Sequence, residues 1–269
     1  MQGASTLEAS ALGAEPIGLT DCLNFGNPER PEIMWQLAEA IEGIVEAARA
    51  LDIPVVGGNV SLYNETEERA ILPTPTVAVV GLLERAHKAR PMAFRQAGDS
   101  VVLLGRTLAE LGGTEYLACI HGLERGLPPS LDLEAERSAQ RVVREALKAE
   151  FLSSVHDLAD GGLAVALAEC CLGPEGLGAR VSLEGSARPD VLLFSETPSR
   201  YLLSLPGECL EGLSGIAAEH GVPLREIGEV VSSELVVETE AGSLELGVEE
   251  LRGRWSQGFI KNVLTRIGT

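Results

Sequence analysis

The stretch LTDCLNFGNPERPEIMWQLAEAIEGIVEAARALDIPVVGGNVSL, residues 19–62, decides the fold of the N-terminal part of this 269-residue chain. Apolar residues recur at helical spacing over residues 32–51, and Pro31 stands in the first turn, where proline is tolerated. Shorter apolar runs at residues 16–23 and 53–56 flank this segment and predict two strands. Strand, helix and strand favour a parallel crossover, although a long hairpin return stays open.

Each of these two predicted strands ends in a small polar turn, and such ends form the ligand crevices of open α/β sheets. Asp21 ends the first strand, where its carboxylate could bind a metal or accept a hydrogen bond from a nucleotide. Gly57-Gly58-Asn59 follows the second strand, and its glycines let a backbone approach phosphate closely. The Asn59 oxygen is a donor that Mg²⁺ accepts, and Ser61 could offer its hydroxyl to a substrate. Alternatively, Asp21 caps its own turn and Asn59 adopts a left-handed conformation.

A second group of polar residues lies in HDLADGGL, residues 156–163. Glycines that open a helix present free N–H groups to phosphate, and Asp157 and Asp160 could gather magnesium around it. Equally, Asp160 could be an N-cap and the glycines could permit close packing. We expect His156 to be a packed, hydrogen-bonded histidine. The polar segment FSETPSR, residues 194–200, could present hydroxyls and a carboxylate to a ligand or form a plain turn.

Composition excludes several classes of protein. The net charge of −19 argues against nucleic acid and anionic membrane surfaces as partners, since both attract basic proteins. No apolar run reaches the roughly 20 residues of a membrane helix, and the N-terminus lacks an export signal. The five cysteines form no C-x-x-C pair and the four histidines are scattered, so we predict reduced thiols in a cytoplasmic protein without a zinc site.

The charged, irregular segment 84–98 predicts a linker between two domains, 1–90 and 91–269. The first domain has a third strand at residues 76–83, but its sheet is small and leaves an edge uncovered. We therefore expect either that a segment is missing upstream or that this edge pairs with another chain. In the second domain the pattern predicts strands at residues 100–104, 180–183, 200–205, 227–231 and 234–238, and helices at residues 133–151, 160–172, 210–220 and 247–264.

Five segments resemble the C-terminal half of the PurL subunit of phosphoribosylformylglycinamidine synthase, within the PurM/AIR synthase-like superfamily. They are TDCLNFGNPERPE, GGNVSLYNE, PTPTVAVVGLLE, HDLADGGLAVALAE and FSETPSR, in this order along nearly the whole chain. The resemblance implies an α+β fold. A partial ferredoxin-like (PurM N-terminal-like) domain, the truncated second copy of the full-length enzyme, precedes a PurM C-terminal-like α/β domain.

The same resemblance implies an ATP-dependent ligase of purine biosynthesis that uses glutamine as its amido donor. In this family ATP activates formylglycinamide ribonucleotide, and ammonia from a glutaminase subunit (PurQ) displaces the phosphate; a small subunit (PurS) completes the complex. Asp21 and Gly58 match positions that contact ATP, Asn59 matches a magnesium ligand, and Ser61 matches a substrate contact. The family's catalytic histidines belong to the missing N-terminal half, so the resemblance assigns no catalytic residue here and implies that this chain alone is inactive.

The resemblance leaves two other functions open. The chain could be a non-catalytic docking half that binds a structural nucleotide, or a small-molecule kinase of the same architecture. The segments HDLADGG and FSETPSR match an auxiliary copy of the active site, but Ala159 stands where the family usually shows serine. We also expect the uncovered sheet edge to drive self-association into a homo-oligomer.

Overall fold

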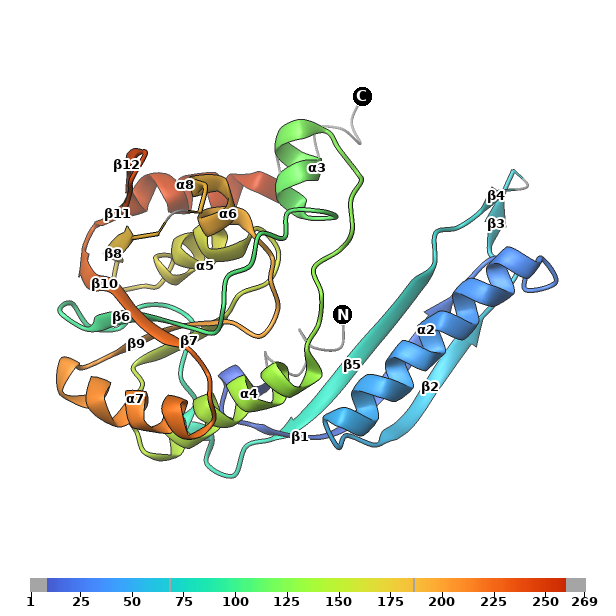
Figure 1. Cartoon of the computed structure of the whole chain (residues 1–269), viewed down its shortest axis with the longest axis horizontal. Helices are drawn as coiled ribbons and strands as arrows, with labels where there is room; N and C mark the ends of the chain where they lie inside the picture. Colours follow the sequence, from blue (N-terminus) through green and yellow to red (C-terminus); the bar gives the residue numbers. More distant parts are fainter. Residues whose placement is uncertain (1–8, 68, 186, 260–269) are drawn as a thin grey trace.

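The computed structural model describes residues 9–67, 69–185 and 187–259, which form two sheets with helices packed on them. A small sheet has the order β2-β1-β5. It is built from β1 (Glu15–Asn24), β2 (Val55–Ser61) and β5 (Thr74–Leu82), with helix α2 (Pro31–Ala50) between the first two strands. In Figure 1 these strands and α2 form an elongated arm that extends away from the larger part of the molecule.

Strand pairing in the arm settles the crossover. Strand β2 runs parallel to β1, and β5 runs antiparallel to it. The βαβ crossover predicted from the sequence is therefore confirmed, and the hairpin alternative is wrong. Helix α2 packs on one face because Ile33 and Leu37 recur on one side of it and join Leu23 and Phe25 in a small core. A short hairpin, β3 (Glu65–Thr66) with β4 (Arg69–Ala70), lies at the far end of the arm.

The larger sheet has seven strands in the order β12-β11-β8-β10-β6-β9-β7. Among its neighbours, β8 and β11 are parallel and the other pairs are antiparallel. The strands are β6 (Ser100–Leu104), β7 (Ser154–Asp157), β8 (Leu177–Leu183), β9 (Tyr201–Leu205), β10 (Leu224–Ser232), β11 (Glu234–Thr239) and β12 (Gly242–Gly247). The helices are α3 (Glu115–His121), α4 (Leu133–Lys148), α5 (Gly162–Cys170), α6 (Pro189–Phe194), α7 (Leu210–Glu219) and α8 (Val248–Phe259).

Helices cover both faces of this larger sheet. In Figure 1, α5, α6 and α8 lie on one side and α4 and α7 on the other. All five residues of β6 are buried, because alternate side chains enter opposite cores. Val101 and Leu103 join the core under α5 and α8, and Val102 and Leu104 join the core under α4 and α7. The mixed α/β fold expected from the sequence is confirmed.

Strand boundaries differ from the sequence prediction in the arm. Asp21 and Gly57-Gly58-Asn59 lie inside β1 and β2, not in turns after them, and Pro75 lies inside β5. Glycine and asparagine favour turns locally, but here pairing of β2 with residues 19–24 of β1 overrides this preference. Residues 84–98 contain only a short 3₁₀ turn at Ala86–Lys88. The division at residue 90 stays a prediction.

Candidate functional site

Parallel pairing in the arm brings two of the predicted site residues side by side. In the register of β1 and β2, Asp21 lies opposite Gly58. A Cβ atom built on Gly58 would lie 2.7 Å from each carboxylate oxygen of Asp21. Only glycine leaves room for the Asp21 carboxylate in this position. The adjacency of these two segments, which the sequence predicted through the crossover, is thus present in the structure.

The other two predicted site residues face the opposite side of the sheet. Asn59 pairs with Cys22 and Ser61 pairs with Asn24. Side chains alternate along a strand, and Leu23 is buried against α2, so Asp21 also faces the α2 side. Asn59 and Ser61 accordingly lie on the face that α2 does not cover. The four residues form two pairs on two faces, where the sequence had suggested one crevice between two turns.

Asn64, which the sequence interpretation did not single out, holds the end of this region together. Its side-chain Nδ2 donates to the backbone oxygens of Ser61, at 2.9 Å, and of Phe25, at 3.0 Å. The same amide lies 3.1 Å from the Ser61 hydroxyl oxygen. Asn64 therefore ties the ends of β1 and β2 to each other and fixes the orientation of the Ser61 side chain. Asn64 lies eight residues beyond the predicted strand at residues 53–56, so no local signal in the sequence indicated this role.

The glycine turn before α5 is occupied by the chain itself. Glu196 Oε1 accepts hydrogen bonds from the backbone N–H of Gly161, at 2.8 Å, and of Glu115, at 2.9 Å. Burial raises the pKa of Glu196, these two N–H groups oppose that rise, and the charges of Asp160 and Glu115 add to it. A carboxylate thus sits where the phosphate interpretation placed a ligand.

Close packing explains the second glycine of this turn. A Cβ on Gly162 would lie 2.5 Å from the backbone oxygen of Ser195, and the residue has a φ of +62°. The packing alternative from the sequence therefore holds for Gly162. The suggested N-cap role of Asp160 is wrong, because Gly161 is the N-cap of α5 and no side chain caps it.

His156 is a packed and hydrogen-bonded histidine, as expected. Its Nε2 lies 2.8 Å from Glu169 Oε2, and its Nδ1 lies 3.5 Å from Asp157 Oδ1. Burial opposes the charged ring, but the hydrogen bonds to Asp157 and Glu169 outweigh it and raise the pKa of His156 to about 9. The ring is consequently charged at neutral pH, which suits a structural ion pair better than an acid–base catalyst.

Arg200 is buried and stabilises the segment FSETPSR by donating hydrogen bonds to its backbone. The side chain is fully buried, its Nε donates to Thr197 O at 2.8 Å, and its Nη1 donates to Thr107 Oγ1 at 3.0 Å. Burial lowers the pKa of Arg200 to about 10, although the charges of Glu110 and Glu196 oppose this. A fully buried guanidinium with these neutral partners fits neither a phosphate contact nor a surface ion pair.

Two family models match successive segments of the chain. Residues 8–83 match the family described as AIR synthase related protein, N-terminal domain, and residues 96–239 match its C-terminal domain. The chain belongs to the AIR synthase related protein family. Within the part of the chain that the structure describes, no group of three or more His, Cys, Asp or Glu residues is placed to hold a metal ion. No helix among the described residues could cross a membrane.

Family members with curated names include subunits called phosphoribosylformylglycinamidine synthase subunit PurL. The one from Anaeromyxobacter sp. (strain Fw109-5) is 49% identical over 258 residues, covering 93% of this chain and 33% of the relative. The one from Moorella thermoacetica is 48% identical over 251 residues, covering 93% and 34%. This chain therefore spans about a third of the length of these relatives, and the resemblance inferred from the five segments is confirmed.

Two solved structures share the fold of this chain. T. maritima PurL complexed with FGAR superposes with a TM-score of 0.76 at 20% identity, over 93% of this chain and 42% of the other. Hydrogenase maturation protein HypE in complex with ATP gives a TM-score of 0.66 at 20% identity, over 91% and 77%. At this level of identity the likeness concerns the fold alone.

Proposed function

We propose that this chain is the C-terminal portion of a phosphoribosylformylglycinamidine synthase. The whole enzyme would convert formylglycinamide ribonucleotide, ATP and glutamine-derived ammonia to formylglycinamidine ribonucleotide, ADP and phosphate. Identity of 49% to a PurL subunit supports this function. The observation that carries it is the pairing of Asp21 with Gly58, because it gathers the predicted nucleotide contacts at one place on the arm.

The four site residues keep their proposed roles on two faces of one edge. Asp21 and Gly58 contact ATP, Asn59 holds Mg²⁺ and Ser61 contacts the substrate. Strand β2 is an edge strand, and residues 55–60 are all exposed, so a ligand at this edge can reach both faces. Mg²⁺ supplies charge neutralisation for the phosphates when bound, and the amide oxygen of the exposed Asn59 is a ligand of the type it accepts.

The remaining two thirds of the enzyme supply what this chain lacks. The catalytic histidines belong to the N-terminal half, so we expect no turnover from this chain alone. A glutaminase subunit (PurQ) and a small subunit (PurS) are the proposed partners, and the structure described as PurLQS from Thermotoga maritima supports such an assembly. We also propose a cytoplasmic location, which agrees with this chemistry.

Calorimetry with ATP tests the proposed nucleotide site. We expect the chain to bind ATP only in the presence of Mg²⁺, and Asn59→Ala to abolish this binding. Gln257→Ala, an exposed amide on α8 far along the chain, is the matched control and leaves binding unchanged. Turnover of formylglycinamide ribonucleotide by the 269-residue chain alone contradicts the proposal, as does Mg²⁺-independent binding that Asn59→Ala leaves intact.

One observation favours a second candidate, a docking half without its own nucleotide chemistry. Glu196 already occupies the glycine turn before α5, so that turn has no free N–H at Gly161 to offer phosphate. A folded chain that binds no ATP at all, yet associates with the N-terminal half of a PurL subunit, favours this candidate. Phosphorylation of an alcohol without any need for ammonia favours a kinase of the same architecture.

The uncovered edge of β2 also supports the proposed self-association. Val55, Val56 and Val60 are 49%, 70% and 57% exposed, and the edge presents unpaired backbone groups. Light scattering at rising concentration is expected to show dimers or larger species. A strict monomer at high concentration contradicts this part of the proposal.

A further inference from the structure

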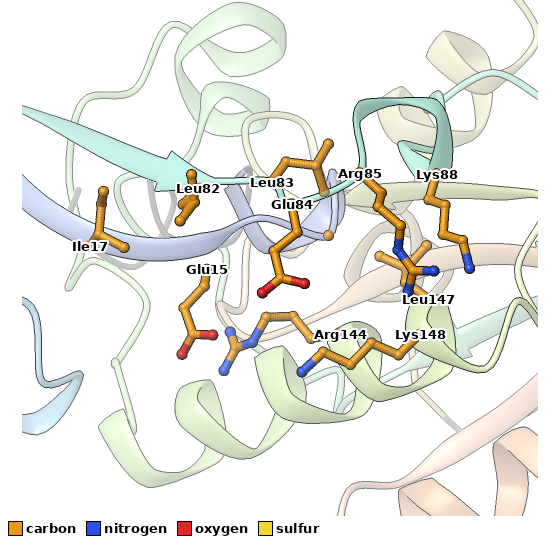
Figure 2. Close-up of a pocket in the computed structure, with 11 residues that line it drawn as sticks. Glu15, Ile17, Leu82, Leu83, Glu84, Arg85, Lys88, Arg144, Leu147 and Lys148 are labelled. Carbon is orange, nitrogen blue, oxygen red and sulfur yellow. The ribbon is translucent and has the colours of Figure 1, made fainter.

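A cavity lies at the junction of the arm and the larger part of the molecule, away from the proposed ATP site. It has a volume of about 280 Å³ and is bounded by the base of β1, the end of β5, the segment that follows β5, and α4. Figure 2 shows side chains from these elements turned toward one another around it. None of Asp21, Gly58, Asn59 and Ser61 lines this cavity.

Four cationic side chains gather around the cavity, namely Arg85, Lys88, Arg144 and Lys148. This is a marked local excess, because the chain has only 21 Lys and Arg against 40 Asp and Glu. Lys88 forms an ion pair with Glu150, outside the cavity lining. Among the described residues, the other three cations have no carboxylate within 4.0 Å.

Arg144 is half-buried and is held by a hydrogen bond to a neighbouring side chain. Its Nη1 donates to Ser10 Oγ at 2.9 Å. Burial lowers the pKa of Arg144, while the nearby charge of Glu15 opposes that effect. A half-buried guanidinium without an ion-pair partner gains from an anion, because a charge-assisted hydrogen bond is stronger inside a protein than in water.

The cavity also has an apolar side and two acceptors. Ile17 and Leu82 are 49% and 58% exposed, and the buried Leu147 also lines the cavity. Glu15 and Glu84 line the cavity with carboxylates, which accept hydrogen bonds from hydroxyl groups. The site thus offers cations for an anionic head, carboxylates for hydroxyls and aliphatic side chains for the C–H face of a ring.

We propose that this junction cavity binds a sugar phosphate, free or as part of a nucleoside monophosphate. Arg85, Arg144 and Lys148 hold the phosphate, since guanidinium groups match its oxygens in a fork and a phosphate dianion satisfies more than one cation. The sugar lies over Leu82, with its hydroxyls toward Glu84. The volume suits a small ligand, because it falls just below the usual range for drug-sized molecules of about 300–1,000 Å³.

Calorimetric titration of the whole 269-residue chain with ribose 5-phosphate, in the absence of ATP and Mg²⁺, tests the proposal. We expect saturable binding that weakens as salt is added, and a loss of about tenfold in affinity with Arg85→Ala and with Lys148→Ala. Both side chains belong to exposed residues, so these variants keep the fold, which circular dichroism checks. Arg106→Ala, an exposed arginine outside the lining, is the matched control.

Two further measurements identify the preferred ligand and separate this cavity from the proposed ATP site. Glu84→Gln is expected to weaken ribose 5-phosphate severalfold and to leave inorganic phosphate unchanged, while AMP reports whether a base adds affinity. Asn59→Ala leaves ribose 5-phosphate binding intact, so failure here and failure of the ATP site are separate results. Equal affinities for inorganic phosphate and ribose 5-phosphate, or an affinity that Arg85→Ala and Lys148→Ala leave unchanged, overturn the proposal.

Discussion

The two glycine pairs of this chain resemble each other in sequence and differ in what approaches them. Gly57 and Gly58 lie on the exposed edge strand β2, and Asp21 is the side chain beside Gly58. Gly161 and Gly162 are buried before α5, where Glu196 and the backbone of Ser195 fill the space. A glycine pair therefore indicates that something comes close. Whether a ligand or the chain itself does so depends on the tertiary structure.

Alanine at one glycine of each pair gives the largest expected difference. Gly162→Ala forces a Cβ to within 2.5 Å of a backbone oxygen at a φ of +62°, so we expect a loss of about 3 kcal/mol or more in the free energy of unfolding. Gly58→Ala meets only the end of the Asp21 side chain, which can turn away, so its cost is about 1 kcal/mol or less. Urea denaturation of both variants measures this, and equal losses break the comparison.

The next largest effect is the pH dependence of stability that comes from His156, in the segment before the second glycine pair. The folded pKa of His156, about 9, lies above the unfolded value of 6.5, so the charged ring stabilises the fold fully below pH 6.5. This stabilisation, up to about 3 kcal/mol, is lost as the pH rises from 6.5 to 9. Thermal unfolding of the native chain and of His156→Gln across this range checks it. His87→Gln, at an exposed residue, keeps the native pH profile. A native profile in His156→Gln contradicts the assignment.

The smallest effect concerns the carboxylate in the glycine turn. Glu196→Ala leaves the N–H groups of Gly161 and Glu115 without their acceptor, so we expect a loss of about 2 kcal/mol. Glu196→Gln keeps an oxygen in that position and loses about half as much. Chemical denaturation distinguishes the two. If Glu196→Ala is as stable as the native chain, water or solvent anions serve the turn equally well, and the contrast between the two glycine pairs becomes weaker.

Elements built from continuous apolar runs were predictable from the sequence. The five residues of β6 and the start of α4 match the prediction, and the crossover through α2 gave the correct parallel pairing. Strands β7 and β12 were missed because SVHD and GSLELG carry little apolar pattern. The short helices α3 and α6 were missed because seven and six residues give too little periodicity.

The candidate site was predictable in its residues more than in its geometry. Adjacency of Asp21 and Gly58 follows from a crossover, which the sequence indicates. Asn59 lies on the opposite face of the sheet from Asp21 and Gly58. This can be inferred only once β2 is known to continue through the two glycines. Contacts such as Glu196 with Gly161, 35 positions apart, leave no local trace in either segment. Long-range packing alone decides them.

The central position of β6 has a consequence for how the larger part of the molecule unfolds. This strand lies between β10 and β9, and it gives Val101 and Leu103 to one core and Val102 and Leu104 to the other. Neither helical layer can detach without uncovering apolar groups that the strand shares with the opposite layer. Both layers are thus coupled into a single cooperative transition, and the backbone amides of β6 are expected to exchange with deuterium last of all.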